Sequence, residues 1–405
     1  MPEAVIVSTA RTPIGRAFKG SLAEMRADEL AAVAIQAALA QVPSLDPTDI
    51  EDLILGCGLP GGESGFNMAR IVSVLMDMDH LPGTTVNRYC SSSLQSTRMA
   101  LHAIKAGEGD VFISAGVEAV SRSTKGHSDN LPDTENPIFA EAAKRTADRV
   151  ATGGAWSDPR DAGDLPDVYI SMGLTAENVA ELHGVSRADQ DAFAVRSQNL
   201  TNQAQAEGFW DRDLLPVQLP NGQVADRDDS PRAGVTMESV GALSPAFRPD
   251  GTVTAGNACP LNDGAAALVI MSDTKARELG LTPLARIVST AVSGLAPEIM
   301  GLGPVEASRR ALARAGLGVD DIDLFEINEA FAAQVIASGR ELGLDFDRLN
   351  VHGGAIAVGH PFGMTGARIA STLVNGLQVK DKQFGLETMC VGGGQGMAMV
   401  IERLS

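Results

Sequence analysis

"IVSTA" occupies residues 6–10 of the chain and occurs again at residues 287–291. Each copy has the composition of a strand and leads to an alanine-rich amphipathic segment that predicts a helix, over residues 27–40 and 305–315. A strand and a helix that recur together at a distance indicate a duplicated structural unit. Because helices of such units cover the faces of a sheet, the repeat predicts an α/β fold.

Three further pairs of segments follow in the same order in both copies. They are "DIEDLILG" (49–56) with "DIDLFEIN" (321–328), "TTVNRYCSS" (84–92) with "RLNVHGGA" (348–355), and "GDVFISAGVE" (109–118) with "LETMCVGGG" (386–394). The order predicts an N-terminal half formed by residues 1–120 plus 246–274 and a C-terminal half formed by residues 275–405. Residues 121–245 differ in character, since they are rich in Pro, Gly and Asp around one predicted helix (Arg187–Glu207). We expect this segment to be an inserted loop domain that carries binding residues.

Composition restricts the class of protein. The 405 residues are 44% hydrophobic and 20% charged, as in an ordinary soluble globular protein, and the net charge of −19 disfavours nucleic-acid binding. No apolar run reaches the ~18 residues of a membrane span, and the first residues lack the basic region of a signal peptide. The four cysteines are far apart and form no CxxC motif. These features predict free thiols and a cytoplasmic location.

"VNRYCSSSLQS" (86–96) places Cys90 at a corner between a strand and a helix. Leu94, Leu101 and Ile104 fall on one helical face, Gly107 marks the end of the helix, and the serines are favourable N-cap residues. A helix N-terminus favours the thiolate form of a cysteine, which predicts a nucleophile. The alternative interpretation is a small buried core residue, so the assignment depends on partners elsewhere in the chain.

Three other residues at strand ends are candidate partners. Asn328 follows the strand "IDLFEI" and precedes a helix expected to begin at Glu329, so it is either a functional amide or a helix cap. His360 lies in the glycine-rich segment "HGGAIAVGHPFGMTG" (352–366), with Pro361 at a helix-start position. Cys390 precedes "VGGGQG". A cysteine nucleophile needs a base such as histidine and N–H groups for an oxyanion, and a second cysteine suits proton transfer at carbon.

Other motifs are excluded. The glycines after Cys390 are followed by the strand "MAMVIE" and not by the helix that a dinucleotide-binding fingerprint requires. The sequence has no phosphate-binding loop of the GxxxxGK[ST] type, and the spacing of Cys, His and acidic residues predicts no metal site.

At these residues the sequence resembles the thiolase family, whose members make or cleave 3-ketoacyl-CoA. The resemblance spans nearly the whole chain in seven ordered blocks: "VNRYCSSSLQ", "MGLTAENVA", "PAFRPDGTVTAGN", "LNDGAAA", "NEAF", "GGAIAVGHP" with "GMTGAR", and "CVGGGQG". It implies a duplicated α/β core in five α-β-α-β-α layers with an inserted loop domain. It also implies a homodimer or homotetramer that uses coenzyme A and acyl-CoA as substrates and needs no metal, flavin or nicotinamide.

The resemblance also implies catalytic roles. Cys90 would become acylated after His360 takes its proton, and Cys390 would move a proton at the carbon next to the thioester. The N–H groups of Cys90 and Gly392 would hold the acyl-enzyme oxygen. His360 and a water carried by Asn328 would hold the thioester oxygen as it becomes enolate-like.

Residues for coenzyme A and the acyl chain are also implied. Arg232 occupies a position where the family often places an arginine beside the adenine and phosphates, although a surface arginine is an equal alternative. Phe247, Ala255 and Met172 match positions that line the pantetheine and acyl pocket, although each would equally be a core residue; Met172 is expected in a loop that approaches the site. Cys259 stands where a serine often hydrogen-bonds coenzyme A.

Several positions depart from the family pattern. Ser93 replaces a glycine, Ser171 replaces a histidine found in many acetoacetyl-CoA enzymes, and His352 replaces a frequent asparagine. Residues 122–168 also match the short-chain enzymes poorly. These departures favour a 3-ketoacyl-CoA thiolase of fatty-acid β-oxidation over a strict acetoacetyl-CoA-forming acetyltransferase.

Two other classes remain as alternatives. A ketoacyl-carrier-protein synthase shares the fold but normally completes its site with a second histidine or an asparagine, which Cys390 argues against. A non-catalytic acyl-CoA-binding relative would lack some of the catalytic side chains, whereas all four are present here.

Overall fold

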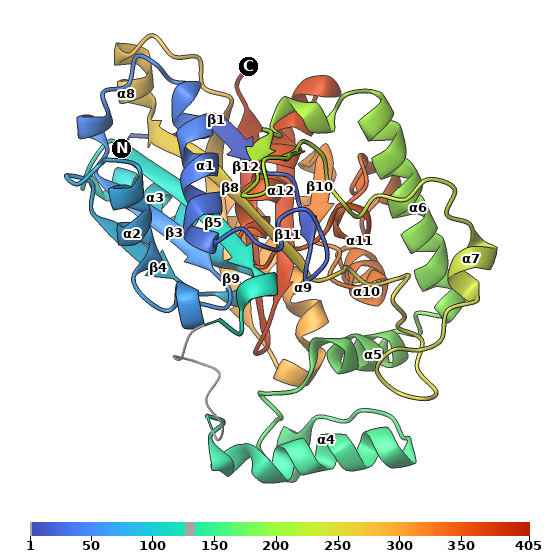
Figure 1. Cartoon of the computed structure of the whole chain (residues 1–405). Coiled ribbons are helices and arrows are strands. Elements are labelled where there is room, and N and C mark those ends of the chain that lie inside the picture. Colours follow the sequence, from blue (N-terminus) through green and yellow to red (C-terminus); the bar gives the residue numbers. More distant parts are fainter. Residues whose placement is uncertain (1, 126–133) are drawn as a thin grey trace.

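The computed structural model describes residues 2–125 and 134–405 (Figure 1). Its strands are β1 (Ala4–Arg11), β2 (Gly15–Arg16), β3 (Asp52–Cys57), β4 (Gly83–Val86), β5 (Val111–Ala119), β6 (Val217–Gln218), β7 (Val224–Ala225), β8 (Asn262–Ser272), β9 (Ala285–Gly294), β10 (Leu324–Ile327), β11 (Phe384–Val391) and β12 (Gln395–Arg403). Its helices are α1 (Ala27–Ala40), α2 (Met68–Leu75), α3 (Ser92–Ala106), α4 (Ala140–Thr152), α5 (Met172–Leu182), α6 (Arg187–Ala206), α7 (Met237–Gly241), α8 (Asp273–Glu278), α9 (Gly303–Ala315), α10 (Ala332–Leu342), α11 (Ala355–Val358) and α12 (Thr365–Val379). α1 and α9 are the two helices that the repeat predicts.

The two copies of the repeat form two matching groups of strands. Hydrogen bonds order the strands β10-β11-β12-β9-β1-β8-β5-β3-β4, with β2 beside β8. The order outward from β1, through β8 and β5 to β3, matches the order outward from β9, through β12 and β11 to β10. The groups meet where β1 pairs antiparallel with β9, through Val5–Ile6 and Ala285–Arg286. The predicted duplication is therefore confirmed.

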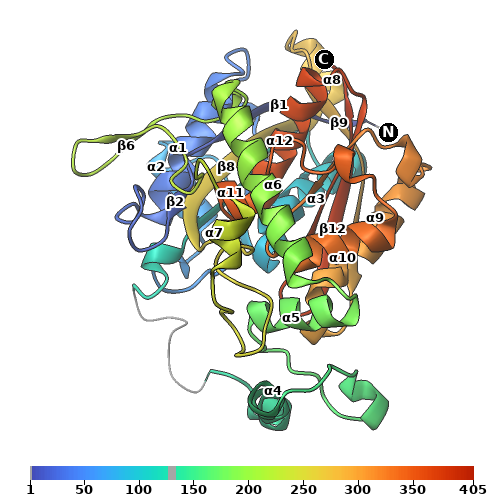
Figure 2. The same ribbon diagram turned by 90° about the vertical axis from the view of Figure 1, so that its right-hand side faces the viewer.

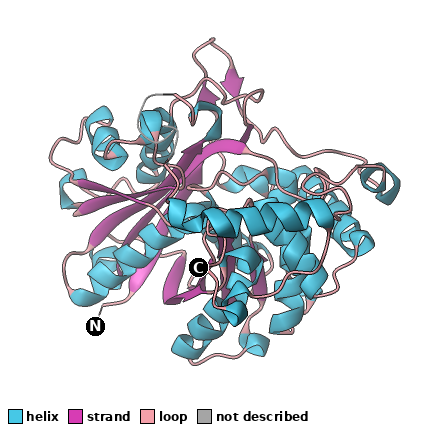
Figure 3. Ribbon diagram, turned by 90° about the horizontal axis from the view of Figure 1, so that it is seen from below, coloured by secondary structure: helices cyan, strands magenta, loops and turns pink. Residues whose placement is uncertain are grey.

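Helices cover both groups of strands and also separate them. α1 and α2 pack on the outer face of the first group, and α9 and α10 pack on the outer face of the second. α3 and α12 lie between the groups and pack against each other. Figure 3 shows the strands running between these layers of helices. The result is the five-layered α-β-α-β-α arrangement that the family resemblance implies.

The central strands are apolar on both faces because each face meets a layer of helices. In β8, alternate residues belong to two different cores: Ala265, Ala267, Val269 and Met271 to the core under α1, and Ala266, Leu268 and Ile270 to the core around α3 and α12. The strand predicted at residues 265–271 lies within β8. α3 also follows its prediction, since Leu94, Leu101 and Ile104 are buried and Gly107, with φ of +78°, ends the helix.

The segment between the copies holds more helix than the sequence predicts. The predicted helix is α6, which begins with a capping box between Ser186 and Asp189, but α4, α5 and α7 were not predicted. Only Ala142 and Thr146 of α4 are buried, so this helix contributes little to the core. Figure 1 shows α4 apart from the layered body, and Figure 2 shows α6 running across its face. Residues 126–133 of the predicted insertion lie outside the described residues.

Candidate active site

Cys90 lies on a strained turn between β4 and α3. The preceding residue, Tyr89, has a φ of +43°, a left-handed conformation that is costly for a residue with a Cβ atom. The Tyr89 N–H donates to Asn87 Oδ1 at 2.7 Å, and the Ser92 hydroxyl donates to the Tyr89 carbonyl at 2.7 Å. Ser91 occupies the N-cap position of α3 but its side chain accepts no N–H of the helix, so the predicted serine cap is wrong. The serines at this corner brace the turn instead.

The Cys90 sulfur is buried and receives N–H groups from both copies of the repeat. Burial, the largest effect, raises the pKa of Cys90 to about 11. Hydrogen bonds from the N–H groups of Gly392 and of Cys90 itself lower this pKa, and the charge of Glu118 raises it. The expectation that the helix N-terminus makes Cys90 a thiolate is therefore wrong, because desolvation outweighs the N–H groups. Cys90 rests as a neutral thiol beside two N–H donors.

His360 is a buried neutral imidazole whose tautomer follows from its hydrogen bonds. Its Nδ1 lies 2.7 Å from Thr365 Oγ1, and that hydroxyl donates to the Pro361 carbonyl, so Nδ1 must carry the proton. Nε2 then has a free lone pair and accepts from Asn328 Nδ2 at 3.2 Å. Burial, together with the charge of Arg368, lowers the pKa of His360 to about 3. An Nε2 atom that carries no proton suits a general base, which takes a proton only as the reaction proceeds.

Asn328 is not a helix cap. α10 begins at Ala332 instead of Glu329, and Phe331, not Asn328, precedes its first turn. The Asn328 amide instead donates to His360, while its Oδ1 is buried and has no hydrogen-bond partner among the described residues. An unpartnered buried acceptor next to a base is a place for a water or a substrate group. The structure thus places the predicted amide and the predicted base in direct contact.

Cys390 lies in a buried cluster against which Met172, one of the acyl-pocket candidates, packs. It lies near the end of β11, is fully buried, and packs with Phe331, Met300 and Met172. Met172 is the first residue of α5, so the prediction that it lies in a loop is wrong. Burial raises the pKa of Cys390 well above its usual range, and the nearby thiols of Cys90 and Cys259 raise it further. Three of the four cysteines therefore lie around one point.

A cavity of about 580 Å³ opens at one of these thiols, Cys259. Arg232, Ala255 and Cys259 line it, as does Arg16, which sequence reasoning missed. Phe247 lies outside this lining, but its ring packs edge-on against Phe331 at 6.1 Å between centroids. The volume is typical of a ligand site, and the two arginines give it a local positive charge in an acidic protein.

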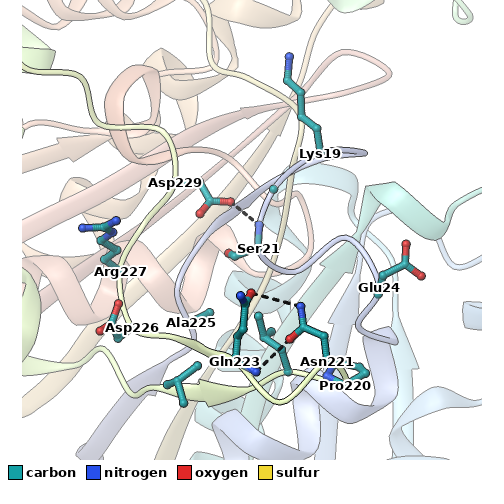
Figure 4. Close-up of a pocket in the computed structure, with 13 residues that line it drawn as sticks. Lys19, Ser21, Glu24, Pro220, Asn221, Gln223, Ala225, Asp226, Arg227 and Asp229 are labelled. Carbon is teal, nitrogen blue, oxygen red and sulfur yellow. Dashed lines mark hydrogen bonds between the residues drawn. The ribbon is translucent and has the colours of Figure 1, made fainter.

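The segment that presents Arg232 is anchored by buried and half-buried acids. Asp228 forms an ion pair with the buried Arg11 at 2.8 Å, and Asp229 accepts the N–H of Ser21 at 2.8 Å. Figure 4 shows the Asp229 contact within a second cavity of about 520 Å³. The polar residues of that cavity come from residues 19–24 and 219–229. Arg232 is thus an exposed side chain on an anchored segment, which favours the functional interpretation over a free surface arginine.

Positions that depart from the family pattern have structural roles. The Ser93 hydroxyl oxygen accepts the N–H of Ala367 at 2.9 Å and so joins α3 to α12. The His352 ring stacks on Phe209 at 3.7 Å between centroids. Ser171 is exposed immediately before α5.

Residues outside the predicted set also hold the site. The N–H of His360 donates to Asn262 Oδ1 at 2.9 Å, and Thr365 fixes the imidazole. Asn262 lies in the family block "LNDGAAA" and Thr365 lies in the family block "GMTGAR". Membership of these blocks is the only sequence signal for the two residues. No group of three His, Cys, Asp or Glu side chains within residues 2–125 and 134–405 could hold a metal ion. In the same described part of the chain, no helix is long and apolar enough to cross a membrane.

The sequence matches known family descriptions along nearly its whole length. Residues 4–274 match the family description "Thiolase, N-terminal domain" and residues 281–403 match "Thiolase, C-terminal domain". The chain is 44% identical to a 3-ketoacyl-CoA thiolase of Bacillus subtilis (strain 168), over 99% of this chain and 100% of that one. It is 45% identical to a 3-oxoadipyl-CoA/3-oxo-5,6-dehydrosuberyl-CoA thiolase of Escherichia coli (strain K12) and 44% identical to an acetyl-CoA acetyltransferase of Cupriavidus necator, in both cases over 100% of both chains.

Solved structures agree over the whole chain. An acetyl-CoA acetyltransferase from Bacillus anthracis superposes with a TM-score of 0.87 at 37% identity, over 100% of this chain and 99% of that one. Human mitochondrial 3-ketoacyl-CoA thiolase in complex with CoA superposes with a TM-score of 0.85 at 35% identity, over 100% of this chain and 98% of that one.

Proposed function

The chain belongs to the thiolase family, and we propose that four of its residues carry out the acyl transfer: Cys90, His360, Asn328 and Cys390. The protein is an acyltransferase that moves acyl groups to and from coenzyme A. It cleaves 3-ketoacyl-CoA to acetyl-CoA and a shortened acyl-CoA, or condenses acetyl-CoA in the reverse direction.

In the first half-reaction, the Cys90 sulfur attacks the thioester carbonyl while its proton passes to Nε2 of His360. The carbonyl oxygen becomes negative and is held by the N–H groups of Cys90 and Gly392, which already point at the sulfur. When the tetrahedral intermediate collapses, the carbon–sulfur bond of the substrate breaks and the leaving thiolate takes the proton from His360. Because thiol and imidazole are both neutral at rest, proton transfer and attack occur together.

In the second half-reaction, carbon replaces sulfur as the nucleophile. Cys390 first passes its thiol proton to Nε2 of His360, because burial keeps it a neutral thiol at rest. The resulting thiolate removes a proton from the carbon next to the thioester of acetyl-CoA, and the thioester oxygen gains enolate character. His360, and a water on the free Oδ1 of Asn328, would hold that oxygen. The carbanion then attacks the acyl group on Cys90, and the Cys90 sulfur leaves as a thiolate that takes the proton from Nε2 of His360. Reversal of these steps cleaves a 3-ketoacyl-CoA.

Coenzyme A is proposed to enter through the cavity of about 580 Å³ as a substrate, with no metal or other cofactor required. Arg232 would bind its phosphates, and Ala255 and Cys259 would lie along the pantetheine arm. Phe247 and Met172 would bound the acyl group, because they pack with Phe331 and Cys390. The relative solved in complex with CoA supports coenzyme A as the ligand.

The acyl range is proposed to extend beyond acetoacetyl-CoA. The relatives named 3-ketoacyl-CoA thiolase and 3-oxoadipyl-CoA thiolase support longer acyl groups, and the small Ser171 before α5 supports them too. A relative named acetyl-CoA acetyltransferase supports the narrower alternative. Steady-state kcat/KM values for 3-ketoacyl-CoA substrates of increasing chain length would decide, because the narrower alternative requires a sharp fall after the first.

We further propose that the protein assembles as a homodimer or homotetramer and acts in the cytoplasm in β-oxidation. β4 is an edge strand of the sheet, and the nearby Phe66 and Leu75 side chains are exposed, which supports contact with a second copy. The four free thiols support a reducing compartment. The proposed domain division keeps residues 121–245 as a loop domain inserted into the N-terminal half (1–120 plus 246–274), followed by the C-terminal half (275–405).

One observation carries the proposed chemistry: the Cys90 thiol receives the N–H of Gly392 from the other copy of the repeat. The test is incubation with acetyl-CoA followed by mass spectrometry of the intact protein and its peptides. One acetyl group should appear on the Cys90 peptide, and Cys90→Ser should abolish both this label and turnover. Acetylation elsewhere, or full turnover by Cys90→Ser, would refute the assignment.

A further inference from the structure

Glu118 is a buried acid with an unusual set of partners. It lies near the end of β5 and is 2% exposed. Its Oε2 accepts the N–H groups of Gly58 and Gly363, both at 2.9 Å. Its Oε1 accepts the N–H of Leu59 at 3.2 Å and lies 3.7 Å from the Cys57 thiol. Among the residues that the structure describes, no Lys, Arg or His side chain forms an ion pair with Glu118, so these donors are what compensates its burial.

These donors come from both copies of the repeat. Gly58 and Leu59 follow β3 in the first copy, whereas Gly363 lies three residues after His360 in the second. The carboxylate therefore ties the end of β3 to the loop that carries the base.

The tied segments meet beside the nucleophile. The Phe362 ring packs edge-on against the His360 ring at 5.2 Å between centroids. A Cβ atom at Gly58 would lie 2.7 Å from the Phe362 side chain and 3.3 Å from the Tyr89 carbonyl, so these three backbones are in close contact. Tyr89 directly precedes Cys90. A shift of the His360 loop away from Gly58 would thus change how the imidazole faces the Cys90 turn.

We propose that Glu118 is a positioning residue for acyl transfer, whose ionised carboxylate holds the His360 loop against the Cys90 turn. This inference rests on the proposed roles of Cys90 and His360. Only a carboxylate fits the position, because a glutamine offers one oxygen to several donors and turns its own N–H groups toward them. Burial raises the pKa of Glu118 to about 7, and the N–H groups of Gly363, Gly58 and Leu59 limit that rise. The same negative charge acts on Cys90 and raises the pKa of its thiol.

Two variants separate the two effects of this carboxylate, charge and reach. Glu118→Gln removes the charge. It should lower the midpoint of the pH profile for alkylation of Cys90 by about one unit, and it should also lower kcat about 10- to 100-fold through displacement of the base. Glu118→Asp keeps the charge but is shorter, so its kcat should fall while its alkylation midpoint stays near that of the wild type. KM for acyl-CoA should change little in both variants, since Glu118 does not line the cavity.

Asp263→Asn is the matched control. Asp263 is another buried acid of the same sheet, on β8, and it accepts the N–H of Ser121 at 2.8 Å. It is not among the groups that shift the pKa of Cys90, so this substitution should leave the alkylation midpoint unchanged. A merely structural role for Glu118 would lower the free energy of unfolding of both Glu118 variants and leave the kcat of the folded enzyme at the wild-type value.

Hydrogen–deuterium exchange keeps the proposal testable if Glu118→Gln folds poorly. In Glu118→Asp, the peptides that contain Gly58 and Gly363 should exchange faster, while peptides of α1 should exchange as in the wild type. Unchanged exchange at Gly58 and Gly363, or wild-type kcat in both variants, overturns the proposal. Failure of the proposed function would look different, because Cys90→Ser would then retain turnover whatever the Glu118 variants do.

Discussion

Iodoacetamide should alkylate Cys90 slowly at neutral pH, although acetyl-CoA acylates it readily. The pKa of the buried thiol is about 11, against an ordinary value of 9.0. This difference makes the thiolate fraction near pH 7 about 100-fold smaller than in a free cysteine, which corresponds to about 3 kcal/mol. The rate of alkylation should therefore rise about tenfold per pH unit and level off near the thiol pKa of about 11.

Acylation escapes this limit because His360 takes the proton as the sulfur attacks. His360→Ala should therefore reduce the rate of acetylation by acetyl-CoA at least about 100-fold, the typical effect of losing a general base. The same substitution should leave the midpoint of the alkylation profile in place, because the imidazole is neutral and is not among the groups that shift the pKa of Cys90.

The assay is mass spectrometry of the Cys90 peptide after brief exposure to iodoacetamide over a pH series, for the wild type and His360→Ala. Intact-protein mass after mixing with acetyl-CoA gives the acylation rate of both proteins. An alkylation midpoint at or below about 9, the ordinary thiol value, would refute the neutral thiol. Equal loss of alkylation and acylation in His360→Ala would refute the concerted transfer.

Cys390→Ala should leave acylation of the nucleophile largely intact and abolish exchange of the acetyl-CoA methyl protons with solvent deuterium; exchange at the wild-type rate would contradict its role. Asn328→Ala should lower kcat for condensation roughly 100-fold, measured by steady-state kinetics. The extent of acylation, measured by the mass of the intact protein, should change little. Arg232→Ala should raise KM for coenzyme A about tenfold with kcat kept, and an unchanged KM would show that it is only a surface residue. The folded-state pKa values of His360 and His352, about 3 and about 4, lie below the ordinary 6.5. Both imidazoles gain protons on unfolding in acid, so the free energy of unfolding should fall below about pH 6.5, by up to about 1.4 kcal/mol per pH unit for each histidine; equal stability by urea titration at about pH 7 and about pH 5 would contradict this.

The layered fold and the members of the site could be predicted because they leave local signals. The repeated "IVSTA" segments became β1 and β9, and the apolar run at residues 265–271 became a strand buried on both faces. The conspicuous cysteines and the glycine-rich loop around His360 lie where strand ends of the two copies meet.

What could not be predicted depends on contacts between distant segments. The thiolate expected at Cys90 is lost to burial, which outweighs even the N–H group that Gly392 donates from about 300 residues away. α10 starts late because Phe331 is extended, with φ of −146°, and forms a β-bridge with Ala258. A local helix preference at Glu329 yields to that pairing, and the Glu329 carboxylate instead accepts the Ser197 hydroxyl and the N–H of Ile356.

The antiparallel pairing of β1 with β9 also bears on how such a chain could arise. Antiparallel contact between equivalent strands is what a twofold axis produces, so the two copies are arranged as the subunits of a homodimer would be. In such an ancestor each subunit would contribute half of two identical sites. Fusion of the two genes would free each half to specialise, one keeping the nucleophile corner at Cys90 and the other keeping the base at His360 and the carbon acid–base group at Cys390. The present site then occupies an ancestral subunit boundary, and neither half of the chain can contain it alone.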